Sequence, residues 1–285
     1  MSDTIQQGGR RTLGKTRSGT AEKPLVSVLT VVWNAADTLE RTIRSVKGQT
    51  YANIEHIIVD GASTDGTLDV IKRNTDHLDL WMSAKDRGIY DAMNKGIALC
   101  TGEWVAMINA DDWYEPDTIE RMVRAAQSRP DTVNIVHGDM WIHYPNGQMR
   151  VKHAKRSGFL LKYWEMVLNH PTFFVRRSFY KGRPFDPEFR VSGDHQWTVR
   201  AYLEDPAQFH YIPEALSHHS AGGASFAIPF GKALKETRRL SRSVGMGLFG
   251  QYLSMSVRVA LYVPQHLKLW FNEHLASDRQ AASKA

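Results

Sequence analysis

Apolar runs rich in β-branched residues alternate with helical patterns between residues 25 and 137, and this alternation most constrains the fold. The first run, Leu25–Trp33, is typical of a parallel strand that is buried on both faces. Apolar residues then recur at helical spacing from Leu39 to Val46, and Gly48 ends that segment. Strands that alternate with helices favour parallel βαβ units with right-handed crossovers, so the sequence predicts an α/β fold.

The same patterns predict the other elements. Up to residue 138 we expect strands at 54–59, 78–82, after Gly102 and at 133–137, and helices after the loop 60–67, at 89–99 and from Pro116 to about Arg129. Beyond residue 138 we expect a hairpin at 141–151, helices at 159–167 and 196–203, strands at 170–175 and 209–212, and a helical region at 226–285 that Pro264 interrupts.

The strand after Gly102 ends in two adjacent carboxylates, Asp111 and Asp112. Open α/β sheets bind their ligands at the carboxyl ends of strands. Adjacent carboxylates repel each other unless a cation lies between them, and hard divalent cations prefer oxygen ligands. The segment therefore predicts a metal site that holds a phosphorylated ligand, and a solvated turn is the alternative.

Charge and cysteine content narrow the classes of protein. The 285-residue chain has a formal charge of +6 and a pI near 9.3, which favours an anionic partner such as a nucleotide, a phospholipid surface or a nucleic acid. With Cys100 as its single cysteine, the chain forms no internal disulfide, which fits a reducing compartment. Residues 1–23 contain no signal-peptide apolar core, and no run of about 18 apolar residues suggests a membrane span.

Residues 1–23 are polar, glycine-rich and basic, which predicts a disordered arm. Within this arm, Gly9–Thr16 matches the phosphate-loop pattern in every letter. That loop works only between a buried strand and a helix, where backbone amides converge on phosphate. Since residues 1–8 do not have the pattern of a strand, we interpret the match as chance.

Four stretches resemble family 2 glycosyltransferases: Val26–Asn34, Ile57–Thr67, Asp86–Gly96 and Gly102–Asp112. A weaker likeness runs from His170 to Ser225. The stretch Gly88–Gly96, with sequence GIYDAMNKG, is similar to the branch that builds bacterial surface polysaccharides and glycolipids. The resemblance implies the GT-A fold, with a mostly parallel central sheet flanked by helices and a helical C-terminal extension.

The resemblance also implies inverting transfer of a sugar from a nucleotide-diphosphate donor to an acceptor hydroxyl. Asp111 and Asp112 match the family's metal motif and would hold Mn²⁺ or Mg²⁺, with Asn109 at a position where many relatives have Asp. Gly61 likewise stands where relatives often have a second acid. The nucleotide-sugar contacts implied by the family are Val31, Trp33, Asp60, Asp86, Arg87, Gly88 and Asp111.

Inverting transfer needs a base near the acceptor hydroxyl. Asp194 matches the family's later acidic site, and it also suits a helix N-cap. His170 and His195 are candidates for the acceptor side, because His170 lies in an acceptor-side segment and His195 replaces the usual aromatic residue. The pair His218-His219 precedes a segment that resembles a loop closing near the donor.

The expected domains are the arm 1–23, a GT-A domain at 24–225 and a helical extension at 226–285. Within the GT-A domain, residues 24–138 would bind the nucleotide sugar and residues 139–225 the saccharide or lipid-linked saccharide acceptor. The extension mixes arginines with Leu, Phe and Met, so peripheral membrane contact and packing or dimer formation both fit it. We expect a protein of the cytoplasm or of the inner face of the cell membrane.

Two other functions were weighed against this one. A sugar-nucleotide pyrophosphorylase would need a glycine-rich loop directly after the first strand, and Val31–Ala36 contains no glycine. A nucleic-acid-binding protein would suit the basic charge, but the positive residues are divided between arm and tail and no recognition module is present. We therefore expect no nucleic-acid partner.

Overall fold

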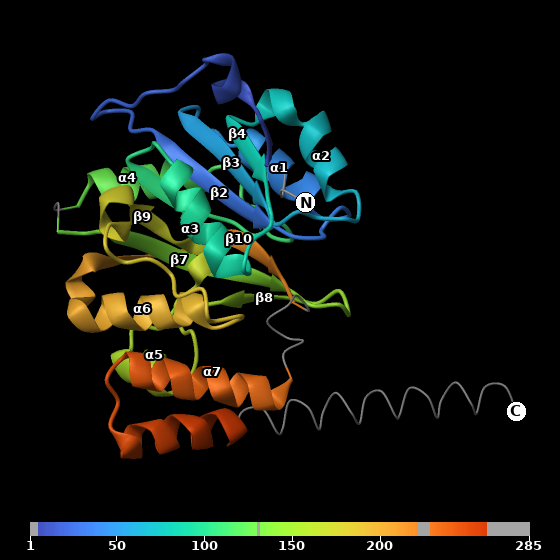
Figure 1. The fold of residues 1–285 in the computed structure, drawn as a ribbon. Coiled ribbons are helices and arrows are strands. Elements are labelled where there is room, and N and C mark those ends of the chain that lie inside the picture. Colours follow the sequence, from blue (N-terminus) through green and yellow to red (C-terminus); the bar gives the residue numbers. More distant parts are fainter. Residues whose placement is uncertain (1–4, 130–131, 222–228, 261–285) are drawn as a thin grey trace, which may run out of the picture.

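The computed structural model describes residues 5–129, 132–221 and 229–260. Its centre is a mixed sheet with the strand order β1-β4-β3-β2-β5-β9-β7-β10-β6, and β8 pairs with β7 (Figure 1). The strands are β1 (Gln6–Gly8), β2 (Val26–Val32), β3 (Ile54–Asp60), β4 (Leu80–Ser83), β5 (Trp104–Met107), β6 (Trp113–Tyr114), β7 (Ile135–His143), β8 (Met149–Lys152), β9 (Phe174–Arg176) and β10 (Phe209–Ser220).

Helices cover both faces of this sheet. The α-helices are α1 (Leu39–Lys47), α2 (Thr67–Arg73), α3 (Ile89–Leu99), α4 (Thr118–Gln127), α5 (Gly158–Tyr163), α6 (Gly193–Glu204) and α7 (Phe230–Ser243), and residues 248–260 are helical as well. Short 3-10 turns are η1 (Arg10–Leu13), η2 (Thr75–His77), η3 (His170–Thr172), η4 (Arg177–Tyr180) and η5 (Pro206–Gln208). In Figure 1, α5, α7 and the 248–260 helix lie together at one end of the molecule, away from α1 and α2.

The side chains of β2 show which helices cover each face. Leu29 and Val31 pack with residues of α3 and α6, whereas Val28 packs with α4 and Val32 packs with α1 and α2. Successive side chains of a strand point to opposite faces, so a strand covered on both sides must be apolar at odd and even positions alike. This requirement explains the nearly unbroken apolar run that identifies β2 in the sequence.

The strands β4, β3, β2 and β5 are parallel to one another, as predicted. Val32 at the end of β2 is in register with Asp60 at the end of β3, so their loops leave the sheet at one edge. The second half is mixed, because β9 enters antiparallel between β5 and β7. The strand predicted at 170–175 begins only at Phe174, since His170–Thr172 form the 3-10 turn η3 around Pro171.

The N-terminal arm differs from the disorder expected for it. Residues 6–8 form β1, which pairs antiparallel with β4, and Arg17 Nε lies 2.9 Å from the buried carboxylate of Asp79. Arg11 donates to the Leu99 carbonyl at 2.7 Å and lies 3.6 Å from Glu55. Composition predicted disorder because it does not reveal that these arginines have buried acidic partners elsewhere in the chain. The expectation that no strand precedes the phosphate-loop match was wrong, because residues 6–8 form β1 directly before it. This strand is short and mostly exposed, and the 3-10 turn η1 follows instead of an α-helix, so the buried strand and helix that such a loop requires are not there.

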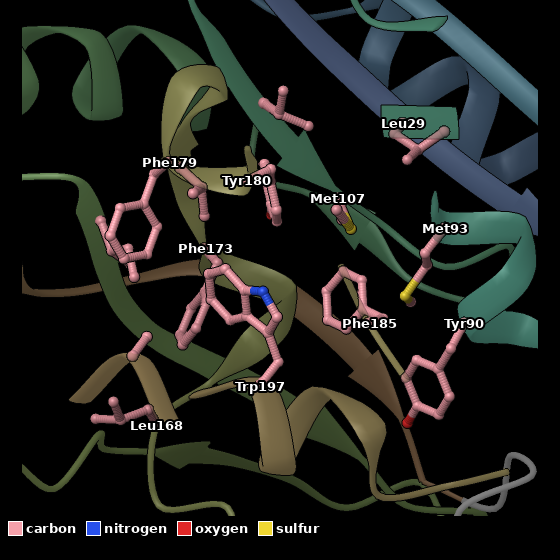
Figure 2. Close-up of a cluster of buried hydrophobic side chains, with 14 of the residues drawn as sticks. Leu29, Tyr90, Met93, Met107, Leu168, Phe173, Phe179, Tyr180, Phe185 and Trp197 are labelled. Atoms are coloured by element: carbon pink, nitrogen blue, oxygen red, sulfur yellow. The ribbon is translucent and has the colours of Figure 1, made fainter. Parts of the chain in front are cut away.

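An aromatic cluster joins α6 to the sheet (Figure 2). The Phe185 ring lies between Trp197 of α6 and Tyr90 of α3, with ring centroids 5.6 Å and 5.8 Å apart. Trp197 Nε1 also donates a hydrogen bond to the Arg183 carbonyl at 2.8 Å. Buried, stacked aromatic rings hold neighbouring elements firmly, so the start of α6 has a fixed position relative to α3.

Among the described residues, no helix combines the length and apolar character needed to cross a bilayer.

Candidate active site

Asp112, which follows β5, is fully buried. Its Oδ1 accepts hydrogen bonds from His219 Nδ1 at 2.9 Å and from the backbone N–H of Ser220 at 3.2 Å. Its Oδ2 is buried and has no hydrogen-bond partner within the described part of the chain. A buried carboxylate oxygen without a hydrogen-bond donor costs free energy, so this atom indicates where a cation or a hydrogen-bond donor of a ligand would bind.

Asp111 is half-buried next to Asp112. Burial and the charge of Asp112 raise the pKa of Asp111. The repulsion between the two carboxylates would be relieved by a divalent cation, and hard cations choose oxygen ligands, so the pair fits such an ion. Among residues 5–129, 132–221 and 229–260, no cluster of three or more His, Cys, Asp or Glu side chains could hold a metal alone. A cation here therefore needs further ligands from substrate or water.

The last strand, β10, brings His218 and His219 to the acidic pair. Burial lowers the pKa of His219, but its hydrogen bond to Asp112 and the charges of Asp112 and Asp111 outweigh burial and raise it. His218 instead contacts Glu115, with Nε2 and Oε1 2.9 Å apart. The sequence predicted only the start of this strand, because the irregular stretch around Pro213 hides its continuation.

Arg41 of α1 is a site residue that the sequence motifs do not mark. Its Nη2 donates to the Asp111 carbonyl at 2.8 Å, and its guanidinium lies 3.6 Å from the centroid of the Trp113 ring. Trp113 also stacks on His218, with ring centroids 4.8 Å apart and the planes 5° from parallel. These contacts hold Asp111 and Trp113, the residues directly before and after Asp112.

A second cluster lies where β2 and β3 end. Trp33 follows Val32 and is 68% exposed, whereas Val31 is buried in the sheet. A Cβ placed on Gly61 would lie 2.6 Å from Asp86 Oδ2 and 3.4 Å from Trp33 Cδ1. Glycine at position 61 thus lets the Asp86 carboxylate lie beside the Trp33 ring. An acidic side chain at position 61 would meet the Asp86 carboxylate.

Asp60 lies beneath this cluster and is fully buried. Its Oδ1 accepts from the Ser63 hydroxyl at 2.5 Å, and its Oδ2 accepts from the Ser83 hydroxyl at 2.6 Å. These bonds tie the loop after β3 to the end of β4. The structure thus gives Asp60 a part in shaping the loop, and a direct contact between Asp60 and a base stays a prediction.

Gly88 starts α3 with φ 121°, a conformation that favours glycine. Its N–H donates to Asp86 Oδ1 at 2.8 Å, and a Cβ here would lie 2.6 Å from Arg190 Nη1. Arg190 donates to the Arg87 carbonyl. The start of α3 is therefore joined both to the Asp86 cluster and to the segment before α6.

Arg87 and Lys95 both pair with Asp91 of α3, at 2.9 Å and 3.0 Å. Partial burial would raise the pKa of Asp91, but the hydrogen bonds from Lys95 and Arg87 outweigh it and lower the pKa to about 2. The contact between Asp91 and Lys95 is an i,i+4 ion pair along α3. The Arg87 side chain faces Asp91 as well, so a contact with a diphosphate would require it to change partner.

Asp194 lies in the first turn of α6. The Tyr90 hydroxyl is 2.7 Å from the Val191 carbonyl and 3.0 Å from Asp194 Oδ1. A Cβ on Gly193 would lie 2.7 Å from the Tyr90 ring, so glycine permits this close approach. Burial and the Asp194 charge raise the pKa of Tyr90 well above its ordinary value, so the phenol stays protonated and a donor.

Glu236 of α7 holds the segment that leads into Asp194. The buried carboxylate accepts hydrogen bonds from the backbone N–H groups of Arg190 at 2.6 Å and Ser192 at 2.8 Å, and Val191 N lies 3.2 Å away. A carboxylate shared by several backbone donors is a strong anchor. Sequence reasoning missed Glu236, because an acid within a basic helix resembles a solvent-exposed residue.

Lys152 of β8 is a half-buried cation that hydrogen-bonds to a backbone carbonyl. Its Nζ donates to the Met166 carbonyl at 2.9 Å. Burial lowers the pKa of Lys152, although the negative charges of Glu165 and Asp194 act to raise it. The positive charge of Lys152 acts to lower the pKa of His219. Lys152 therefore lies within electrostatic range of both Asp194 and His219. Its hairpin was predicted, but its place in the site was not.

The two histidines expected on the acceptor side are both buried. His195 Nε2 donates to the Leu161 carbonyl at 2.6 Å, which fixes the ring against α5. An acceptor contact through His195 stays a prediction, and it would have to be made by a ring that is buried and whose Nε2 is already bonded. His170 Nε2 has no hydrogen-bond partner among the described residues, and burial lowers the His170 pKa while Asp194 opposes the shift. The expected closing loop, Gly222–Ser225, lies outside the described residues.

The sequence model of the family described as glycosyl transferase family 2 matches residues 27–182, which include β2, β3, α3 and the acidic pair. The chain belongs to this family. Family 2 membership makes it a glycosyltransferase and favours that function over the pyrophosphorylase and nucleic-acid-binding alternatives. The site residues named above lie partly beyond the matched range, since Asp194, His219 and Glu236 follow it.

Curated relatives of this family 2 glycosyltransferase are bacterial. A PGL/p-HBAD biosynthesis glycosyltransferase of Mycobacterium bovis is 30% identical over 231 residues, which are 79% of this chain and 87% of the relative. The putative glycosyltransferase EpsH of Bacillus subtilis is 36% identical over 114 residues, covering 39% of this chain and 33% of EpsH. These relatives agree with the surface-glycan branch expected from the sequence.

Solved structures confirm the GT-A fold. Staphylococcus aureus TarS 1-349 in complex with UDP-GlcNAc has a TM-score of 0.62 at 16% identity, over 80% of this chain and 69% of that one. This chain spans 41% of the longer TarS structure. The mannosyltransferase PcManGT of Pyrobaculum calidifontis, in complex with GDP-Man and Mn²⁺, has a TM-score of 0.57 at 17% identity, over 93% of this chain and 85% of that one.

Proposed function

We propose that this glycosyltransferase moves a sugar, with inversion, from a nucleoside diphosphate to an acceptor hydroxyl in the synthesis of a surface polysaccharide, O-antigen or glycolipid. The observation that carries the proposal is the buried, unpartnered Oδ2 of Asp112 beside Asp111. The strand expected to end at the acidic pair stops at Met107, and the pair lies in the turn between β5 and β6. Two adjacent carboxylates there favour a cation with a diphosphate, which is the group that such a donor presents.

Asp111 and Asp112 would hold Mn²⁺ or Mg²⁺. When bound, the ion would act as a Lewis acid on the departing diphosphate. The PcManGT complex with GDP-Man and Mn²⁺ supports a divalent ion in this fold. His219 and Ser220 keep Asp112 in place by bonding its other oxygen, which leaves Oδ2 for the ligand.

The donor base would stack on the exposed Trp33 ring, with the Asp86 carboxylate at its edge. An ionised carboxylate only accepts hydrogen bonds, so Asp86 favours uracil, thymine or guanine, whose ring N–H groups donate. The N-terminus of α3 suits the diphosphate, because the helix dipole there favours an anion.

Asp194 would act as the base. The acceptor oxygen attacks the anomeric carbon and loses its proton to Asp194, while the bond from that carbon to the diphosphate oxygen breaks. Tyr90 orients the Asp194 carboxylate from the donor side of the site. The mycobacterial relative named for PGL biosynthesis supports a lipid-linked acceptor, and His170 remains a candidate for the acceptor side.

A thermal-shift series with UDP, GDP, dTDP and CMP, each with Mn²⁺, Mg²⁺ or EDTA, tests the proposal. A ligand that binds only the folded state raises the apparent Tm. We expect UDP, dTDP or GDP to raise the Tm only when a divalent ion is present, and CMP to have little effect. An equal response in EDTA would contradict the metal role, and no response to any nucleotide would contradict the proposed donor class.

A further inference from the structure

Exposed apolar side chains gather on the helix formed by residues 248–260. Leu248, Phe249 and Tyr252 are 72%, 82% and 66% exposed, and Val259 is exposed as well. Leu248, Tyr252 and Val259 have the spacing i, i+4, i+11, which puts them on one side of a helix. Large apolar residues scattered singly are ordinary on a protein surface, but several on one helix face indicate a contact surface.

The preceding helix, α7, has a basic outer face. Its exposed cations are Lys232, Lys235, Arg238, Arg239 and Arg242. Glu236 is the one acidic residue between 229 and 260, and its carboxylate is buried against the 190–192 backbone. Arg239 pairs with Asp186 at 3.3 Å, whereas no ion pair engages the other four cations among the described residues.

The two helices form one folded unit with α5. Arg258 Nε donates to Thr237 Oγ1 at 3.3 Å, so the 248–260 helix runs back along α7. A Cβ on Gly250 would lie 3.6 Å from the Tyr163 ring, which shows how closely this helix approaches α5. Phe159 and Trp164, at the two ends of α5, are also exposed. In Figure 1 these elements occupy the same end of the molecule.

We propose that the exposed faces of α7 and of the 248–260 helix dock this protein on an anionic lipid membrane. Apolar side chains enter the region between head groups and acyl chains, and lysines and arginines are attracted to the negative leaflet. A second copy of the chain fits this surface poorly, because self-association would bring the same uncompensated cations together. An anionic bilayer complements both the charge and the apolar side chains.

Docking through α7 would also orient the acceptor side of the site, a consequence that rests on the proposed function. Glu236, on the inner face of α7, anchors the backbone of residues 190–192 directly before Asp194. The helix that meets the lipid surface would then be the same helix that fixes the segment carrying the base. A lipid-borne acceptor would reach Asp194 from the membrane without leaving it.

Co-sedimentation of the full chain with vesicles tests the docking surface without using activity. Vesicles of phosphatidylcholine alone are compared with vesicles containing 30 mol% phosphatidylglycerol, as a roughly physiological level of anionic lipid. We expect binding to the anionic vesicles only, and weaker binding as salt is raised. The pairs Phe249→Ser/Tyr252→Ser and Arg238→Gln/Arg242→Gln should each lower the bound fraction about tenfold.

Matched pairs elsewhere on the surface serve as controls. Leu13→Ser/Met149→Ser removes comparably exposed apolar residues, and Lys15→Gln/Lys72→Gln removes two exposed cations that have no part in the candidate site. Both control pairs should bind like the unaltered chain. Failure of the unaltered chain to bind anionic vesicles, or unchanged binding by both test pairs, overturns the proposal. A dimer in light scattering that Phe249→Ser/Tyr252→Ser dissociates would assign the surface to a second copy instead.

Discussion

The Tyr90 hydroxyl lies 3.0 Å from Asp194 Oδ1, and this contact joins the helix that begins at the nucleotide side to the helix that carries the candidate base. Because burial and the Asp194 charge keep the phenol protonated, its single hydroxyl hydrogen is shared between the Val191 carbonyl at 2.7 Å and the Asp194 carboxylate. One side chain thus links two segments that lie about a hundred residues apart, and it contacts one oxygen of the Asp194 carboxylate.

Asp194→Asn should remove the base while preserving the fold, since the amide has the shape of the carboxylate. We expect kcat to fall by about 10²–10⁴-fold with donor binding unchanged, as is usual when a general base is lost. Single-turnover rates and calorimetric donor titrations make the measurement. Tyr90→Phe should give a smaller loss and shift the pH–rate profile. Near-normal turnover by Asp194→Asn would exclude this residue as the base.

Gly61→Ala should weaken nucleotide binding without unfolding the protein. The added Cβ would lie 2.6 Å from Asp86 Oδ2, so the carboxylate must leave its place beside Trp33. We expect about a tenfold rise in the nucleotide Kd, equal to about 1.4 kcal/mol, by isothermal titration. Gly231→Ala is the control, because a Cβ there meets no atom within 4 Å. An unchanged Kd for Gly61→Ala would remove Asp86 from the base site.

Asp112→Asn should abolish the dependence of nucleotide binding on a divalent ion. The amide keeps the size of the side chain but offers no charge to the ion and places an NH₂ group near His219 or at the buried Oδ2 position. Titration of nucleotide with Mn²⁺ and with EDTA should give the same weak affinity for this variant. Tighter binding in Mn²⁺ than in EDTA would assign the ion to other residues.

Asp91 should contribute to stability in a pH-dependent way. Its pKa is lowered to about 2 by Lys95 and Arg87 against the effect of burial, so its contribution is present above the unfolded-state pKa of about 3.9. That contribution disappears as the pH falls through the folded-state value. Urea unfolding of the wild type and Asp91→Asn should show a difference at pH 7 that shrinks between about pH 4 and pH 2. A constant difference would contradict the ion-pair explanation.

Glu236→Ala should destabilise the protein by about 1–3 kcal/mol, because backbone donors of the 190–192 segment lose their buried acceptor. Turnover should fall as well, since this segment carries Asp194. Denaturant unfolding and kcat measured on the same sample separate the two effects. Glu236→Gln keeps one acceptor oxygen and should recover part of both. Wild-type turnover in Glu236→Ala would show that α7 does not position the base.

The parallel half of the fold was predictable because its signals are local. A strand covered on both faces needs a continuous apolar run, and β2 has one in Val26–Val32. The positions of Trp33, Asp86 and Asp111 at strand or helix ends follow from the same patterns. In contrast, β10 contains Pro213 and an irregular register, so only its first residues had the pattern of a strand.

The residues that sequence analysis missed act through long-range contacts. Arg41, Lys152 and Glu236 each look like an ordinary charged residue of a hairpin or a helix surface. Their partners lie far away in the sequence, at Asp111, Met166 and Ser192. A charged side chain becomes informative only when the fold shows whether it is buried and what it contacts. For the same reason, the sequence did not predict that His195 is buried.

The pairing of β1 with β4 also protects the sheet from other molecules. An open strand edge presents unpaired N–H and C=O groups that recruit further strands, and residues 6–8 occupy that edge here. The arm also neutralises the buried Asp79 through Arg17. Proteolytic loss of this segment would therefore expose the edge of β4 to pairing with strands of other molecules. Its removal should promote aggregation before it affects catalysis.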